Sequence, residues 1–189
     1  MLLGLPKYRK NILDLSLIVV GAGFNNIFFF FTQFFLANKL GPQYFGILVA
    51  NLAIINFFSI FSVLGSGSMM LKIAGENKAQ LPYYFKSIVK FVSLNSLLSI
   101  ALLIMWAIFG PNDSDTKRNL LLLTLIIPSL VALEILFSQL QIQKKYISLS
   151  ILQSSSNGLR LLFIIIVYIF LTPLSLDKVS YIFILASTI

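Results

Sequence analysis

The chain has 189 residues, of which 58% are hydrophobic and 11% are charged, and its formal net charge is +8. A soluble domain carries about 25% charged residues, so this chain has too little polar surface to cover a globule in water. Cysteine and histidine are both absent. Their absence excludes disulfides, thiolate metal sites and the commonest general base. The composition therefore predicts an integral membrane protein.

The distribution of apolar residues predicts an all-α fold, a polytopic transmembrane helix bundle that forms a single domain over residues 1–189. Windows of about 20 residues, the length that crosses a bilayer, give six apolar runs in chain order: 12–37, 45–64, 88–109, 120–140, 147–171 and 179–189. The first run is too long for a signal peptide and lacks a cleavage site. The last would cover only about 16 Å as a helix. We expect the sixth helix to be truncated and the chain to be the N-terminal part of a longer protein.

Basic residues between the runs predict the orientation, because cytoplasmic segments carry an excess of Lys and Arg. With the N-terminus in the cytoplasm, the inside segments and their flanks hold Lys7, Arg9, Lys10, Lys72, Lys78, Lys86, Lys90, Lys144 and Lys145. The outside segments hold Lys39, Lys117, Arg118 and Lys178. This bias places the N-terminus inside. It also explains the positive net charge without a nucleic-acid surface.

The segments between the runs are too short to fold as a catalytic domain. The longest is the inside segment 65–87, where we expect a turn at 75–77 and a helix break at Pro82. Residues 111–115 form a polar outside turn, and Thr172 and Pro173 end the fifth run. Any function therefore lies between the helices.

Two charged residues lie at membrane depth and are the strongest candidates for a site. Arg160 is near the centre of the fifth run, and Glu134 is in the fourth, about six residues from its inner end. Three interpretations stay open. Arg160 meets an anionic substrate, or it pairs with Glu134 as a structural ion pair. Alternatively, the fifth helix starts near Ser154 and leaves Arg160 at the inner interface.

Uncharged polar residues in the first two runs are weaker candidates. Asn25, Asn26 and Gln33 lie in the first run, where the spacing of seven puts Asn26 and Gln33 on one face of a helix. Such amides join helices by hydrogen bonds more often than they bind ligands, and the same applies to Asn51 and Asn56 in the second run. Two glycines of the first run, Gly21 and Gly23, permit close helix approach or a bend.

One segment carries a resemblance to a known family. Residues 38–46, Asn-Lys-Leu-Gly-Pro-Gln-Tyr-Phe-Gly, resemble the LGP-x-x-FG turn after the first helix of bacterial oligosaccharide and polysaccharide flippases of the O-antigen type. These belong to the multidrug/oligosaccharidyl-lipid/polysaccharide exporter superfamily. The end of the second run (64–67), the basic segment after it and residues 141–145 agree with this pattern. Gly41 and Pro42 end one helix and direct the next.

The resemblance implies a transporter of twelve to fourteen helices in two lobes, with this chain as the first lobe. Such proteins export undecaprenyl-diphosphate-linked glycans across the bacterial inner membrane by alternating access, in surface polysaccharide, lipopolysaccharide or O-antigen biosynthesis. A cationic cavity would suit the anionic diphosphate, and Arg160 is the best candidate for it. The implied partners are the lipid-linked glycan, the bilayer, a polysaccharide polymerase and glycosyltransferases. No cofactor, metal or nucleic acid is implied.

Other function classes remain. A cation-coupled multidrug exporter of the same superfamily should place acids in the first-lobe cavity, where only Glu134 qualifies. An inactive N-terminal fragment is the second alternative, because half of a two-lobed transporter cannot alternate between states. A membrane enzyme is the least favoured, since the sequence has no His, no Cys and no clustered carboxylates at membrane depth.

Overall fold

The structure, a computed structural model, describes residues 5–170 and 174–188, with side chains described from Ser16 onward except at Lys78. Within these residues all regular structure is helical, which confirms the all-α bundle. The elements are α1 (Leu5–Val63), α2 (Ser66–Glu76), a 3-10 turn η1 (Lys78–Gln80), α3 (Leu81–Phe109), α4 (Ser114–Leu123), a 3-10 turn η2 (Thr124–Ile126), α5 (Ile127–Ile142), α6 (Tyr146–Phe170) and α7 (Leu176–Thr188).

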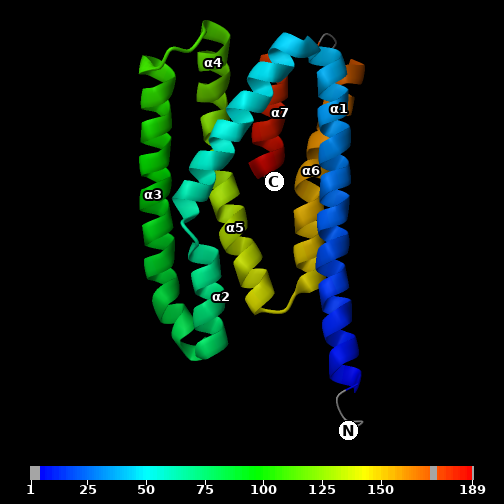
Figure 1. The fold of residues 1–189 in the computed structure, drawn as a ribbon, viewed down its shortest axis with the longest axis vertical. Coiled ribbons are helices and arrows are strands. Elements are labelled where there is room, and N and C mark those ends of the chain that lie inside the picture. Colours follow the sequence, from blue (N-terminus) through cyan, green and yellow to red (C-terminus); the bar gives the residue numbers. More distant parts are fainter. Residues whose placement is uncertain (1–4, 171–173, 189) are drawn as a thin grey trace.

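Helix α1 consists of two helices that meet at a sharp kink, where Figure 1 shows the chain turning back toward α2. Gly41 has φ 77° and ψ 167°, the one non-helical backbone conformation inside α1. A side chain disfavours this conformation, so glycine is required. Pro42 then begins the second half, where a missing N–H costs no hydrogen bond. The expected helix reversal is therefore present, although it takes one residue rather than a loop.

The second pass through the bundle is a broken helix. After Val63 the backbone leaves the helix at Leu64 (φ 44°) and Gly65 (φ 73°), and α2 begins at Ser66. The expectation of a loop over 65–87 was therefore wrong: helices α2 and α3 occupy most of it, and Pro82 lies in the first turn of α3 instead of ending a helix. The 11 residues of α2 are too few and too mixed in polarity to register as an apolar run.

The helices pass up and down the bundle in chain order (Figure 1). Four described stretches are long and apolar enough to span a membrane: Ser16–Glu76, Leu81–Phe109, Ser114–Ile142 and Tyr146–Phe170. The first folds back at Gly41, so the stretches make five passes, and α7 follows as the sixth element. These passes correspond in order to the six expected runs and mark the chain as a membrane protein. Residues 171 and 189, the last of two expected runs, lie outside the described residues.

The half of the bundle nearest the Gly41 kink, hereafter the closed half, contains a core of buried side chains. Its fully buried side chains include Leu36, Leu48, Ile55, Leu120 and Phe183. A chain of amide and hydroxyl groups crosses this core. Asn51 Nδ2 donates to Asn119 Oδ1 (2.8 Å), and Asn119 Nδ2 donates to Ser180 Oγ (2.6 Å). This polar network ties α1, α4 and α7 together, as expected for amides that join helices in membranes.

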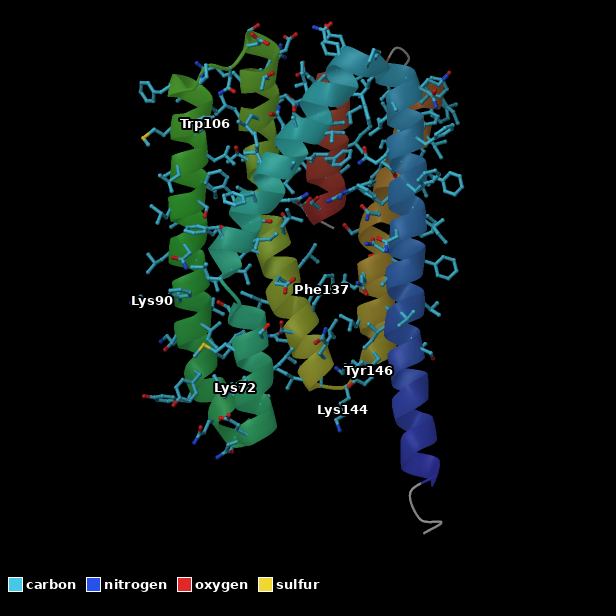
Figure 2. The ribbon with its side chains drawn as sticks, in the orientation of Figure 1. Lys72, Lys90, Trp106, Phe137, Lys144 and Tyr146 are labelled. Atoms are coloured by element: carbon cyan, nitrogen blue, oxygen red, sulfur yellow. The ribbon has the colours of Figure 1, made fainter. Side chains whose placement is uncertain are left out.

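Basic side chains gather at the opposite end. Figure 2 places Lys72 and Lys144 toward the end of the bundle where α1 begins, away from Trp106. Helices α2 and α5 both end there. The segments assigned to the inside by their charge therefore lie on one side of the bundle.

Candidate functional site

A polar cavity of about 450 Å³ lies among α1, α2, α5 and α6. Its lining includes two charged side chains, Glu134 from α5 and Arg160 from α6. The remaining lining combines amides, hydroxyls, small residues and apolar side chains: Asn25, Asn56, Ser59, Ile60, Val63, Gly65, Gly67, Ser68, Leu130, Leu133, Phe137, Gln153, Ser156 and Asn157. Phe137, labelled in Figure 2, lies on the side of α5 that faces α6. This concentration of polar groups at membrane depth identifies the cavity as the candidate site.

A larger groove of about 840 Å³ runs between α1 and α3, but its chemistry is different. Its lining is apolar and includes Phe57, Leu102 and Trp106, with no charged residue. It offers nothing that would orient a polar ligand. The polar cavity is therefore the better candidate.

Arg160 lies fourteen residues after Tyr146 and ten before Phe170, so it is near the middle of α6. Because α6 begins at Tyr146, the interpretation in which the helix starts near Ser154 was wrong. One terminal nitrogen of Arg160 donates to Asn157 Oδ1 (3.0 Å) and the other to Ser187 Oγ (2.8 Å). Its Cζ lies 5.0 Å from the ring centre of Phe183, a cation–π distance. The Nε atom is buried and has no partner among the described residues.

Arg160 is one of four polar residues of α6 that line the cavity, together with Gln153, Ser156 and Asn157. Gln153, Asn157 and Arg160 are separated by four and three residues, the spacing that places side chains on one helical face. Sequence reasoning singled out Arg160 and missed the two amides, although their spacing from Arg160 was the available signal. The polar face ends at Arg160, since Ile164 on the next turn is apolar and fully buried.

A seam of hydrogen bonds between α1 and α6 holds this face in place. Ser150 Oγ donates to the Leu17 carbonyl (2.8 Å), and Ser154 Oγ donates to the Gly21 carbonyl (3.0 Å). One turn further, Asn157 Nδ2 donates to Asn25 Oδ1 (2.9 Å). Asn25 therefore both lines the cavity and joins two helices.

The close approach of the two helices depends on Gly21. A Cβ at this position would overlap Ser150, including the backbone of α6. Gly23 has open space around it. Of the two glycines that the sequence offered for close helix approach, only Gly21 lies where a second helix packs against it.

Glu134 lies near Gly67 at the start of α2. Its Oε1 atom is 3.4 Å from the position that a Cβ of Gly67 would occupy. Glu134 is exposed and its carboxylate makes no hydrogen bond to a described residue. No ion pair joins Glu134 to Arg160 among the described side chains, where the two pairs found are Lys72–Glu76 and Arg118–Asp177. The structural ion pair considered from the sequence is therefore absent, although both residues line one cavity.

The remaining two candidates from the sequence lie elsewhere. Gln33 lines a second cavity of about 460 Å³, which also reaches Arg160 and Asn56. Its Oε1 is buried and has no partner among the described residues. Asn26 is exposed and lines neither cavity that reaches Arg160. Of Asn26 and Gln33, which the sequence predicted to share one helical face, only Gln33 lines a cavity that reaches Arg160.

The cavity is suited to an anion more than to a metal ion. A guanidinium supplies several donors in a plane and keeps its charge under all ordinary conditions. Glu134 is the one carboxylate of the lining, and no group of three or more acidic side chains occurs in the described part of the chain. The site has the donors to hold phosphate or carboxylate oxygens.

Comparisons with known proteins add no further identification. No family model, no curated protein and no solved structure matches the chain.

Proposed function

We propose that this protein takes part in exporting a lipid-linked oligosaccharide across the bacterial inner membrane by alternating access. The substrate would be an undecaprenyl-diphosphate-linked glycan used for surface polysaccharide, lipopolysaccharide or O-antigen biosynthesis. The observation that carries the proposal is Arg160, an arginine at the middle of α6 that faces a polar cavity without an acidic partner. A charge at this depth is expensive and is usually retained for function. The resemblance of residues 38–46 to the flippase turn supports the same substrate class.

The cavity combines an arginine held in a fixed orientation with amide groups that line the same space. Asn157 and Ser187 hold the guanidinium from two sides, so its orientation is set before a ligand arrives. A diphosphate would accept hydrogen bonds from the remaining donors, in the bidentate geometry that arginine favours. The amides of Asn25, Asn56 and Gln153 line the same space and can hydrogen-bond to sugar hydroxyls. The protein would act without covalent chemistry, as a transporter and not as an enzyme.

The basic residues support an orientation with the N-terminus in the cytoplasm. Lys72 and Lys144 share the end where α1 begins, and cytoplasmic segments carry the excess of Lys and Arg. The glycan would then be received from cytoplasmic glycosyltransferases and released toward a polymerase on the other side.

Replacing Arg160 tests the function. In cells that lack the chromosomal copy, we expect Arg160→Ala to abolish glycan display at the cell surface, because the cavity loses its cation. Arg160→Lys keeps a charge but loses the fork of donors, so it should restore only part of the display. The readout is glycan staining on intact cells, with the membrane level of each variant measured by immunoblot.

Arg118→Ala is the matched control. Arg118 pairs with Asp177 on the surface (2.8 Å) and does not line the cavity. We expect this variant to display glycan at the level of the wild type. Unchanged display in Arg160→Ala, at wild-type membrane level, would contradict the proposed function.

A cation-coupled multidrug exporter is the second candidate, and Glu134 favours it because it places a carboxylate in the same cavity. In that case Glu134→Gln would abolish resistance to cationic drugs, whereas Arg160→Ala would leave it intact. A flippase predicts the reverse order of importance for the two residues.

A further inference from the structure

The broken second pass exposes the start of a helix to the polar cavity. Helix α2 begins at Ser66 after Gly65, and its first intrahelical bond runs from the Met69 amide to the Gly65 carbonyl (3.0 Å). The amides of Ser66, Gly67 and Ser68 precede that bond and have no acceptor within the helix. No side chain caps them, and Gly65, Gly67 and Ser68 line the cavity.

The uncapped amides of α2 are one of two positive groups around the same space. Aligned peptide dipoles give the N-terminus of a helix a partial positive charge, and discontinuous membrane helices use such ends to meet anionic groups of substrates. Arg160 provides the second group from the opposite wall, and its guanidinium lies deep in the protein with an unpaired Nε. Both observations indicate that the cavity is built for an anion.

Glu134 already provides a negative charge in this position. Its Oε1 approaches the α2 N-terminus at Gly67, where a negative charge is stabilised. Ser138, one turn along α5, packs against the same glycine, with its Oγ 2.5 Å from the position of a Gly67 Cβ. The absence of a side chain at Gly67 therefore lets α5 bring the carboxylate close to the amides.

The contacts of Glu134 differ from those of its neighbours. Asn25, Asn157 and Arg160 are tied by hydrogen bonds. The Glu134 carboxylate is exposed, bonded to no described residue and paired with no described cation. It can therefore leave the α2 N-terminus by rotating about its own side-chain bonds, at little cost to the bundle.

We propose that Glu134 is a displaceable internal anion, which screens the site formed by the α2 N-terminus and Arg160 until the diphosphate of the substrate replaces it. This inference rests on the proposed function for the identity of the incoming anion. Glu134 acts here as a positioning residue that lowers the affinity of the empty site for small anions. Without such a competitor, the cavity would retain its anionic ligand instead of releasing it.

The test is the affinity of the purified full chain for inorganic pyrophosphate, measured by titration calorimetry in detergent. Glu134→Gln keeps the size of the side chain and removes the competing charge. We therefore expect it to bind pyrophosphate about 5–10-fold more tightly than the wild type, the size of effect that one like charge a few ångströms away has in a water-exposed site. Glu134→Asp keeps the charge and should bind like the wild type. Each variant is first checked for a monodisperse elution profile.

Glu76→Gln is the matched control, because it removes the same charge from the far end of α2, where Glu76 meets Lys72 on the surface (3.9 Å). It should leave the affinity unchanged. An affinity of Glu134→Gln equal to or weaker than that of the wild type would overturn the inference, as would the absence of binding by every variant. A gain of the same size in Glu76→Gln would also overturn it, because the effect would then be one of net charge.

Two further arms separate this inference from the proposed function and from lipid binding. If Arg160→Gln binds pyrophosphate like the wild type while Glu134→Gln still binds more tightly, the site at α2 holds and the role of Arg160 in the proposed function fails. The second arm repeats the titration in vesicles rich in phosphatidylglycerol. Loss of pyrophosphate binding there would assign the site to phospholipid phosphates and overturn the assignment to the diphosphate.

Discussion

The closed half and the polar cavity both place amide side chains between helices, but they satisfy them differently. In the closed half, Asn51 and Asn119 are fully buried, and their hydrogen bonds run from one helix to the next. Around the polar cavity, Asn157 bonds to Asn25 (2.9 Å), whereas Asn56 is exposed and the Glu134 carboxylate bonds to no described residue. The closed half therefore uses its amides as ties between helices, whereas the cavity combines such ties with polar groups that are open to a ligand. Polarity at membrane depth does not by itself distinguish the two roles.

The largest expected effect comes from breaking the polar network. Asn119→Leu removes the two hydrogen bonds that Asn119 makes with Asn51 and Ser180. Asn51 then keeps only its bond to the Thr116 carbonyl (3.1 Å), and Ser180 keeps its bond to the Leu176 carbonyl (2.9 Å). We expect the free energy of unfolding to fall by about 3 kcal/mol, since two buried hydrogen bonds are lost and each contributes about 1–1.5 kcal/mol. Thermal unfolding of the purified protein in detergent measures the loss.

The same substitution in the cavity provides its control. Asn56 is exposed and lines the cavity, so Asn56→Leu should change the free energy of unfolding by less than about 0.5 kcal/mol. Equal losses at the two positions would mean that the cavity amides are structural ties as well, and the contrast between the two regions would fail.

A smaller effect is expected at the seam that supports the cavity wall. Gly21→Ala inserts a methyl group against the backbone of Ser150 and should push α1 away from α6. Overpacking of this kind costs about 2 kcal/mol. Gly23→Ala is the matched variant, because nothing lies within 4 Å of its Cβ. It should stabilise the helix by about 0.5–1 kcal/mol. Opposite signs in the two variants would establish that close approach, and not glycine flexibility, selects Gly21.

The smallest effect is expected at the surface of the closed half. Arg118 and Asp177 form an ion pair of 2.8 Å between α4 and α7, with side-chain exposures of 69% and 33%. Water screens such a pair, so Arg118→Gln should cost less than about 1 kcal/mol. The difference should shrink further when the unfolding is repeated at high salt. A loss as large as that of Asn119→Leu would show that this pair, and not the polar network, holds α7 in place.

The sequence predicted the passes through the membrane well and their ends less well. Long apolar runs separated by charged segments specify α3, α5 and α6, and the Gly41–Pro42 pair marks the reversal inside α1. The end of the second run at 64–67 was predicted, and the break at Leu64 and Gly65 confirms it. Hydropathy could not reveal α2, because its 11 residues are mixed in polarity.

The site was predictable in part. Arg160 and Glu134 were identifiable because charged residues are rare within apolar runs, and the structure brings both to one cavity. Their mutual distance was not predictable, since it depends on how α5 and α6 are tilted. Asn25 and Asn26 are adjacent in sequence, and a helix necessarily points them in different directions. Only packing against α6 decides that Asn25 is the one that meets the cavity.

The interruption at Leu64 and Gly65 also has a mechanical consequence. Bending a continuous helix means stretching hydrogen bonds that are already formed, which is why sharp bends occur where the ladder is interrupted. Here those bonds have been given up, so the angle between α1 and α2 is set by the backbone torsions of two residues. Helix α2 is therefore joined to the second half of α1 by two non-helical residues beside the polar cavity, and its packing against α5, with Gly67 against Ser138, holds it at that angle.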